Sequence, residues 1–353
     1  MRSLTPEEAC HLVRSSLGLS SRGGAWLDGP LGSRSLLLPG LALGPHLEAV
    51  LAIGAFDGFH LGHRALVSSA LEEAQRRGVP CLVVMFNPDP DELFMGDSAP
   101  RRLLVCEDRA RMIFAAGVDG VILLGFDEGL ASMEPADFVR QVLCRIAHPV
   151  SVHVGENFRF GHLGSGNCDT LRACGSAAGF EVTTHALVKR GDETVSSTRI
   201  RALLSQEDGL AEANGLLGRC HFLRGVVEHG RGEGTTFGFP TANVRFPGLS
   251  CMPAQGVYGG YVAMGSSAWP AAINVGAPPT FSGPDELFCE ANLIGFSGDA
   301  YGREVCVTFA QWLRPSRPFS SLEELEQVVL GNIDWVRNHL GDGEIGLGVA
   351  LDY

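Results

Sequence analysis

The segment from Ala49 to Arg77 constrains the fold of this chain more than any other stretch. A run of apolar residues, Ala49–Ile53, is followed by a glycine-rich turn, Gly54–His63, and then by a segment with helical spacing. An unbroken apolar run of this kind is typical of a parallel strand that is buried on both faces. The order strand, glycine turn, helix predicts an α/β sheet with an anion site at the helix N-terminus.

The turn carries residues that suit the phosphates of a nucleotide. Gly54, Gly58 and Gly62 let the backbone turn tightly and approach a ligand. His60 and His63 are three positions apart and share a face if the turn is already helical. The alternatives are ordinary surface histidines or a metal site, but zinc needs three or four ligands and no further His/Cys cluster lies nearby in the sequence.

The next hundred residues alternate between strand and helix patterns. Apolar runs predict further buried strands at 79–86, 118–124, 150–154 and 180–184. Helical spacing predicts helices at 106–116, 135–146 and 167–178. This alternation predicts a doubly wound, mostly parallel sheet. Two loops, 87–90 and 155–161, follow strands at their carboxyl ends, where such sheets bind ligands.

A second candidate anion site follows this region at 195–201. Ser197 and Thr198 offer hydroxyls that can cap a helix, and Arg199 and Arg201 fall in its first turn. A run of hydroxyl residues is by itself a common helix cap. Combined with the turn at Gly54–His63, it indicates a triphosphate, because a triphosphate needs donors from more than one side.

The pattern changes near residue 217. Short alternating strands with frequent glycine are predicted at 221–229, 257–264, 271–275, 287–294 and 303–310. This pattern favours a small antiparallel barrel. Leu322 to Leu340 has the spacing of an amphipathic helix that closes the domain, and residues 5–17 form a helix with a Thr5–Glu8 capping box. Residues 20–48 give no clear pattern.

Composition limits the classes of function. With 353 residues the chain is long enough for two domains, and a net charge of −13 argues against a nucleic-acid partner. The ten cysteines contain no C-x-x-C and indicate reduced thiols of a cytoplasmic protein. No apolar run reaches about 18 residues and the N-terminus does not read as a signal peptide, so we expect no membrane partner.

The glycine turn also carries a family resemblance. Residues 54–63 read G-x-F-D-G-x-H-x-G-H, which resembles the signature of the FAD synthetase branch of the nucleotidylyltransferase superfamily. The related pantetheine-phosphate and nicotinate-nucleotide enzymes share H-x-G-H but lack the preceding Phe-Asp-Gly. The resemblance therefore favours FMN as the nucleotide that is adenylylated.

The second half carries a separate motif. By composition alone, the glycine-rich stretch 230–234 and the segment Phe237–Asn243 read as a hairpin with a proline turn, although Thr241 and Asn243 offer hard oxygens that suit Mg²⁺. The sequence G-F-P-T-A-N at 238–243, however, resembles a specific signature of riboflavin kinase barrels. Further matches follow in order, at 256–258, 274–276, 279–281, 301–302 and 333–334.

Together, residues from about 48 to 340 resemble the bacterial bifunctional riboflavin kinase/FAD synthetases. The resemblance implies a divergent N-terminal extension at 1–45, an FMN adenylyltransferase domain at 46–212 and a riboflavin kinase domain at 217–342. It implies ATP-dependent phosphorylation of riboflavin to FMN and then adenylylation of FMN to FAD. The expected partners are riboflavin, FMN and ATP with Mg²⁺. The sequence leaves open whether the protein forms a homo-oligomer.

The resemblance also implies roles for individual residues. Glu290 corresponds to the catalytic base of the kinase, and His60 and His63 act in adenylyl transfer. The ATP site of the adenylyltransferase comprises Gly54, Phe56, Asp57, Gly58, His60, His63, Asn157, Ser197, Thr198 and Arg201. The flavin contacts are Asn87, Asp89 and Tyr258, the kinase ATP contacts are Gly232, Gly234, Gly238 and Pro240, and the Mg²⁺ ligands are Thr241 and Asn243.

Two departures from the family pattern concern the kinase half. Glu233 and Thr235 stand where the kinase phosphate loop usually has basic residues, and Pro278 replaces the usual arginine before Pro-Thr. Fewer positive charges near a triphosphate predict weaker ATP binding, unless Arg231 or Mg²⁺ compensates. The alternatives to the bifunctional enzyme are thus an FAD synthetase with an inactive or weak kinase barrel, and a flavin-binding module without catalysis.

Overall fold

The chain divides into two units. The computed structural model describes residues 2–29, 32–229, 241–276, 288–317 and 319–351. The barrel unit comprises Met1–Ser20, Arg101–Val105 and Ser197–Tyr353, and the α/β unit comprises Ser21–Pro100 and Cys106–Ser196. Residues 1–45 are thus shared between the two units.

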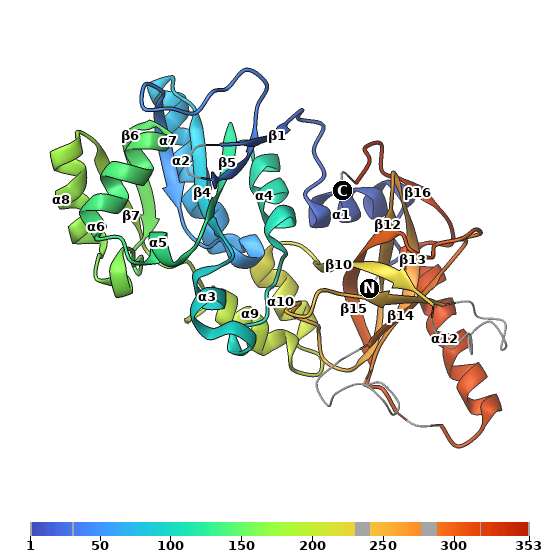
Figure 1. The fold of residues 1–353 in the computed structure, drawn as a ribbon. Coiled ribbons are helices and arrows are strands. Elements are labelled where there is room, and N and C mark those ends of the chain that lie inside the picture. Colours follow the sequence, from blue (N-terminus) through green and yellow to red (C-terminus); the bar gives the residue numbers. More distant parts are fainter. Residues whose placement is uncertain (1, 30–31, 230–240, 277–287, 318, 352–353) are drawn as a thin grey trace. The chain divides into compact units, whose positions relative to one another are not determined.

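A seven-stranded sheet forms the centre of the α/β unit (Figure 1). The described strands lie in the order β1-β2-β5-β4-β3-β6-β7. Strands β3 to β7 pair in parallel, and antiparallel β1 and β2 extend the β5 edge, so the predicted doubly wound, mostly parallel sheet is confirmed. The strand bounds are β1 Ala25–Asp28, β2 Arg34–Leu37, β3 Glu48–Ile53, β4 Cys81–Asn87, β5 Gly120–Gly125, β6 His148–Gly155 and β7 Glu181–His185.

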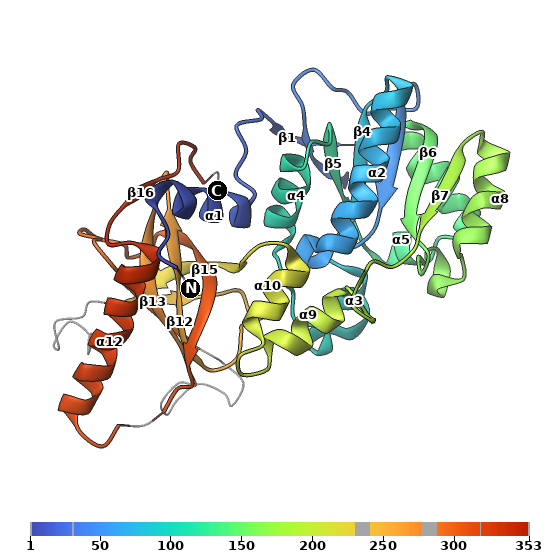
Figure 2. The same cartoon turned by 180° about the vertical axis from the view of Figure 1, so that it is seen from behind.

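Helices cover both faces of this sheet (Figures 1 and 2). The helices α2 (Leu61–Arg77) and α4 (Cys106–Ala115) follow crossovers in one direction and pack on one face. The other face is covered by α8 (Cys168–Ala178) and by a helical run with a π-turn in its middle. That run comprises α6 Pro135–Phe138, Val139–Leu143 and α7 Cys144–Ile146. Burial on both faces explains why these strands read as unbroken apolar runs.

The barrel unit closes on itself through six of its described strands. They lie in the order β12-β15-β10-β11-β14-β13, and β13 pairs again with β12. All these neighbours are antiparallel, so the predicted antiparallel barrel is confirmed. The strand bounds are β10 His221–Glu228, β11 Ala242–Arg245, β12 Gly256–Met264, β13 Ser267–Gly276, β14 Phe288–Leu293 and β15 Glu304–Arg314, with a short β16 at Ile345–Gly346.

Helices complete the barrel unit. The predicted helix at the N-terminus is α1 (Pro6–Leu17), which begins with the expected capping box between Thr5 and Glu8. The predicted closing helix is α12 (Leu322–Leu340), which packs on β12 and β13. Two short helices, α9 (Ser197–Leu204) and α10 (Leu210–Leu217), precede the barrel, and α3 (Pro90–Met95) and α5 (Glu128–Ala131) belong to the α/β unit. Among the described residues, no helix is long and apolar enough to cross a membrane.

Candidate active sites

The turn after β3 lies at the switch point of the parallel sheet. The connection after β3 runs to β4 on one side, and the chain later crosses from β5 to β6 on the other side of β3. Sheets of this type bind ligands at the carboxyl ends of the strands where the direction of winding reverses. The segment Gly54–His63 follows β3 at that edge. The turns Asn87–Pro90 after β4 and Gly155–Asn157 after β6 leave the two adjacent parallel strands at the same edge. The α/β unit therefore gathers three of the loops that the sequence marked as ligand sites.

Buried aromatic side chains hold the turn after β3 in an unusual backbone path. Phe56 has a φ of 53° and Phe59 a φ of 39°, which bulky residues seldom adopt. Both side chains are 1% exposed, so their burial stabilises this conformation. Gly58, between them, has a φ of 75°. Phe56, predicted to contact ATP, thus lies beneath the turn, where it shapes the backbone.

The two histidines of the turn stack on one another. Their ring centroids are 3.6 Å apart and the rings are 15° from parallel. His60 is the N-cap of α2, and its Nδ1 accepts the backbone N–H of His63 at 3.4 Å. A Cβ atom at Gly62 would lie 3.2 Å from the His60 ring, a tight contact that would require the ring to shift by a few tenths of an ångström. The predicted pairing of the two imidazoles at a helix N-terminus is therefore present.

His63 has a strongly perturbed imidazole. Burial, followed by the charges of His60 and Arg109, holds the pKa of His63 well below its usual value, so the ring is neutral at pH 7. Its Nδ1 is buried and has no hydrogen-bond partner within the described part of the chain. A nucleotide phosphate beside this ring would raise its pKa and strengthen any hydrogen bond between them.

A buried arginine ties the turn after β3 to the loop after β4. Arg109, on α4, has a fully buried side chain and donates to both carboxylate oxygens of Asp89 at 2.8 Å. It also donates to the carbonyl of Ala55 at 2.5 Å and lies 3.6 Å from Asp57. Burial lowers the pKa of Arg109, but Asp89 and Asp57 outweigh it, so the pKa is raised and the guanidinium stays charged. Asp57 and Asp89, predicted as ligand contacts, thus bind a side chain that the sequence did not mark.

Removal of Asp89 is expected to destabilise the protein. Breaking a buried ion pair costs about 3–5 kcal/mol, but Asp57 still compensates part of the charge on Arg109, so we expect Asp89→Ala to cost about 2–3 kcal/mol. Urea unfolding would measure this loss, with Asp91→Ala on the exposed side of α3 as the control, which should stay within about 0.5 kcal/mol of wild type. An Asp89→Ala midpoint equal to that of the control would contradict the assigned role.

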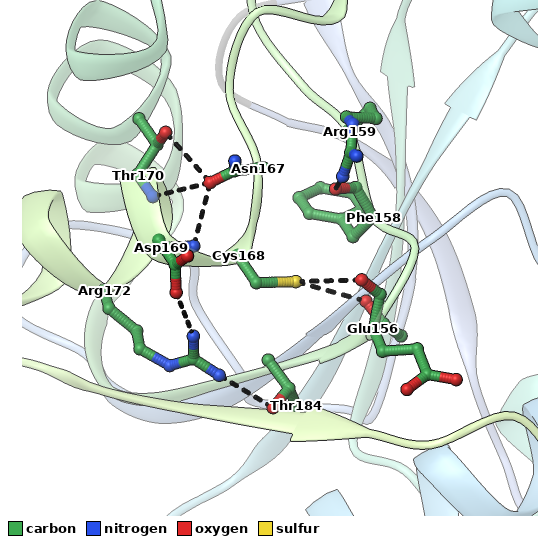
Figure 3. Close-up of polar contacts among 10 residues, drawn as sticks. Glu156, Phe158, Arg159, Asn167, Cys168, Asp169, Thr170, Arg172 and Thr184 are labelled. Carbon is green, nitrogen blue, oxygen red and sulfur yellow. Dashed lines mark hydrogen bonds and ion pairs between the residues drawn. The ribbon is translucent and has the colours of Figure 1, made fainter.

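The turn after β6 is anchored on α8 (Figure 3). The Cys168 thiol donates to the carbonyls of Gly155 and Glu156 at 3.5 Å. The side chain of Asn167 accepts the backbone N–H groups of Asp169 and Thr170 at 2.9 Å and so caps α8. Asn157 itself is exposed at the tip of this turn. Its predicted contact with adenine or ribose is thus compatible with its position.

Apolar side chains surround the loop after β4. Phe94 on α3 is 64% exposed, and its ring meets the ring of Phe126 edge-on at 6.0 Å. The Phe126 N–H donates to the carbonyl of Asn87, itself an exposed residue at the end of β4. Leu93 and Met95 are also exposed. This patch, Leu93–Met95 with Phe126, was not predicted, because its parts come from a helix and a loop about 30 positions apart in the sequence.

The second predicted anion site lies in the other unit. Ser197 and Thr198 begin α9, as the sequence predicted, and Thr198 is exposed. Arg201 donates from Nε to the carbonyl of Arg101 at 2.5 Å. Since these residues belong to the barrel unit and His60 and His63 to the α/β unit, their joint action on one nucleotide stays a prediction.

A polar row crosses four neighbouring strands of the barrel. Glu290 on β14 lies directly opposite Asn243 on β11 and Asn274 on β13. Asn243 in turn lies opposite Glu228 on β10. Directly opposite residues point to the same face, and their Cβ atoms lie about 4.5–5.5 Å apart. Thr241 lies immediately before β11, two positions from Asn243. The barrel thus places the predicted base, Glu290, directly opposite Asn243, one of the two predicted Mg²⁺ ligands.

The other predicted kinase contacts have different outcomes. Tyr258 is 1% exposed, and its hydroxyl donates to the carbonyl of Ala254. Its ring packs edge-on against Trp312, so Tyr258 is a core residue of the barrel. Its contact with the flavin stays a prediction. Gly232, Gly234, Gly238 and Pro240, together with Glu233 and Pro278, lie outside the described residues. Within the described residues, no group of three His, Cys, Asp or Glu side chains could hold a metal ion.

The fold and the two candidate sites define a two-part class of nucleotide-dependent enzyme. The chain joins a nucleotidylyltransferase-like α/β fold to a closed antiparallel barrel with a C-terminal helix. Family models match both parts: FAD synthetase at residues 45–199 and riboflavin kinase at residues 217–340.

Individual relatives extend over both halves. The bifunctional riboflavin kinase/FMN adenylyltransferase of Escherichia coli (strain K12) is 36% identical over 81% of this chain and 91% of its own length. The enzyme of the same name from Pseudomonas fluorescens is 37% identical over 82% and 92%. A crystal structure from Streptococcus pneumoniae, described as a macrolide-efflux protein, superimposes with a TM-score of 0.74 at 29% identity over 84% of this chain and 96% of that one. The chain belongs to the family of bifunctional riboflavin kinase/FMN adenylyltransferases.

Proposed function

We propose that this chain makes FAD from riboflavin in two ATP-dependent steps at two separate sites. The barrel unit phosphorylates the 5′-hydroxyl of riboflavin and releases ADP. The α/β unit then lets the FMN phosphate attack the α-phosphorus of a second ATP, and pyrophosphate leaves. The observation that carries this proposal is that each unit has its own constellation: the stacked His60 and His63 at the switch point, and Glu290 beside Asn243 on the barrel.

Adenylyl transfer needs no general base, because the FMN phosphate is already an anionic nucleophile. The protein must position two anions and stabilise the charge that moves onto pyrophosphate. The N-terminus of α2, with His60 and His63, offers donors suited to that charge. We assign Asn157 to the adenosine part of ATP, and Ser197, Thr198 and Arg201 to its phosphates.

The flavin binds, in this proposal, near the loop after β4. The isoalloxazine ring is large, flat and mostly apolar, and pockets for such ligands combine apolar walls with a few polar groups. Exposed Phe94 and Met95 offer apolar area, and Asn87 offers an amide beside it. Asp89, whose carboxylate is held by Arg109, would contribute through the shape of this loop.

Riboflavin phosphorylation does need a base, because an alcohol is a poor nucleophile at pH 7. We propose that Glu290 accepts the proton of the 5′-hydroxyl as the γ-phosphoryl group is transferred. Asn274, directly opposite Glu290 on β13, can orient its carboxylate through the side-chain amide. The barrel face between β13 and β11 then forms the reacting end of the kinase site.

We assign the Mg²⁺ site to the start of β11, beside Glu290. Thr241 and Asn243 carry oxygen atoms of the kind that Mg²⁺ prefers, and this ion is normally held by few protein groups together with phosphates and water. Its contribution when bound would be to neutralise the charge on the ATP phosphates. A requirement for Mg²⁺ in FMN formation, lost with EDTA and restored by added Mg²⁺, would test this assignment.

The second candidate function is an FAD synthetase with a weak kinase. Glu233 places a negative charge in the kinase phosphate loop and Pro278 removes a positive one, which favours a high KM for ATP in the first step. The retained Thr241, Asn243 and Glu290 favour an active kinase. We also propose that the protein acts in the cytoplasm on small molecules and not on nucleic acid, as a net charge of −13 supports.

Incubation of the protein with FMN, ATP and Mg²⁺ tests the adenylyl step directly. We expect FAD and pyrophosphate in equal amounts. Flavin bound without pyrophosphate release would instead support the binding module. Replacing FMN with pantetheine phosphate or nicotinate nucleotide should give no pyrophosphate, and release with either would contradict the assigned substrate.

A further inference from the structure

Three titratable side chains, two buried and one half-buried, form a hydrogen-bonded chain in the α/β unit. His153, on β6, is 1% exposed and lies between the other two. Its Nε2 is 2.8 Å from Oε2 of Glu73 on α2, and its Nδ1 is 2.9 Å from Nε2 of His185 on β7. Helix α2 packs against β6, so the chain links a helix to two adjacent strands.

The chemistry of the three groups fixes the direction of these hydrogen bonds. Burial raises the pKa of Glu73, but His153 and Arg77 outweigh it, so the pKa is lowered and the carboxylate is an acceptor only. His153 must then donate from Nε2 to Glu73. A neutral His153 accepts at Nδ1, so His185 donates to it from Nε2. Each imidazole therefore has one allowed tautomer.

The hydrogen-bonded chain of side chains ends, at His185, beside the turn that carries Asn157. His185 is the last residue of β7 and pairs with Gly155, the last residue of β6. The backbone N–H of Glu156 donates to the carbonyl of His185 at 2.9 Å. The Glu156 side chain accepts the N–H of Leu187 at 3.0 Å. The position of His185 thus sets where the turn Gly155–Asn157 begins.

We propose that His153 and His185 are positioning residues for adenylyl transfer, which hold the turn Gly155–Asn157 in place through the hydrogen-bonded chain anchored on Glu73. This inference rests on the proposed function, because it takes Asn157 to contact ATP. It adds residues on β6, β7 and α2 that act through the backbone of the turn.

The electrostatic surroundings keep both imidazoles neutral. α2 contributes Glu73, Arg76 and Arg77, and β7 contributes His185 and Glu181, which binds Arg77. Burial lowers the pKa of His153, and the two arginines lower it further against the opposing effect of Glu73. Burial and then the neighbouring imidazole of His153 also lower the pKa of His185.

Acid should therefore break the hydrogen bonds that join Glu73, His153 and His185. The ordinary histidine pKa is about 6.5, so a conformation with the chain broken binds more protons than the closed one as the pH falls below that value. The stabilisation that these hydrogen bonds give to the turn is fully present above about pH 6.5. It is lost as the pH falls through the lowered pKa values of the two histidines. One added proton can be accommodated within the hydrogen-bonded chain. Two added protons would place an N–H group of His153 against the N–H group of His185.

The test compares KM for ATP in FAD formation from FMN at about pH 7.5 and about pH 5.5, on either side of the histidine pKa. In His185→Gln the amide nitrogen can replace Nε2 as donor but does not titrate, whereas His185→Ala removes the donor. His148→Ala changes an exposed histidine at the other end of β6 and serves as the matched control.

Wild type and the control should show a higher KM for ATP at acid pH. We expect His185→Ala to raise this KM about three- to tenfold at the higher pH with kcat nearly unchanged, the range for one lost hydrogen bond. His185→Gln should match wild type at the higher pH and lose the acid-induced rise. FMN formation from riboflavin should be equal in all variants at each pH.

The other outcomes overturn the proposal. An unchanged KM in His185→Ala, even with a lower melting temperature, would mean a structural role only. A His185→Gln variant that behaves like His185→Ala would mean that the ring and not the donor matters. Failure of wild type to make FAD from FMN would instead refute the proposed function, so the two failures are distinguishable.

Discussion

Replacing His63 with alanine is expected to reduce FAD formation from FMN about 1000-fold and to leave FMN formation from riboflavin unchanged. Removal of one preorganised donor to developing charge costs about 100- to 1000-fold in kcat. The upper end is expected because His63 also stacks on His60 at 3.6 Å, so its loss frees the second imidazole. The measurement is the initial rate of FAD formation, resolved by chromatography from the other flavins.

A control variant and the rate of the other step test this prediction for His63→Ala. His148→Ala removes an exposed histidine from the same unit and should keep wild-type rates for both steps. Loss of FMN formation in His63→Ala would contradict the separation of the two sites. FAD formation within about tenfold of wild type would contradict the role of His63 at the reacting phosphates.

Replacing Glu290 with glutamine is expected to have the opposite effect. FMN formation from riboflavin should fall about 100- to 10,000-fold, the contribution of a positioned general base, while FAD formation from added FMN persists. Glutamine keeps the size of the side chain, so the pairing of β14 with β11 and β13 should be preserved. The rate of ADP release with riboflavin measures this loss.

A glutamate elsewhere on the barrel provides the control for this variant. Glu304 is exposed at the start of β15, and Glu304→Gln should keep wild-type rates. A Glu290→Gln enzyme that phosphorylates riboflavin normally would remove Glu290 from the reaction. In that case the row Asn274–Glu290–Asn243 would serve only the strand pairing.

Much of the fold follows from local patterns in the sequence. The apolar run before Gly54 is buried on both sides by helices. Thr5 begins α1 and Gly78 ends α2, as expected. Such signals depend on a few neighbouring residues, so they are readable without the tertiary structure. The strands β1 and β2 escaped prediction because each has only four residues and alternation is too short to recognise.

The site residues that escaped prediction have partners far away in the sequence. Arg109 occupies an ordinary helical position, and only the fold brings it against Asp89 and the turn after β3. The pairing of His153 with Glu73 joins residues 80 positions apart. The strand β11 was not predicted, because it has four residues and follows directly on a motif rich in Gly and Pro. Such contacts require the sheet order, which local patterns do not supply.

The central claim is that one chain holds two independent sites that act in series. Flavin profiles after incubation with riboflavin, ATP and Mg²⁺ test it most directly, for wild type, His63→Ala, Glu290→Gln and an equal mixture of the two variants. Wild type should produce FAD, His63→Ala should stop at FMN, Glu290→Gln should leave riboflavin unchanged, and the mixture should restore FAD. A mixture that yields no FAD, although wild type does, would contradict independent sites that pass FMN between them.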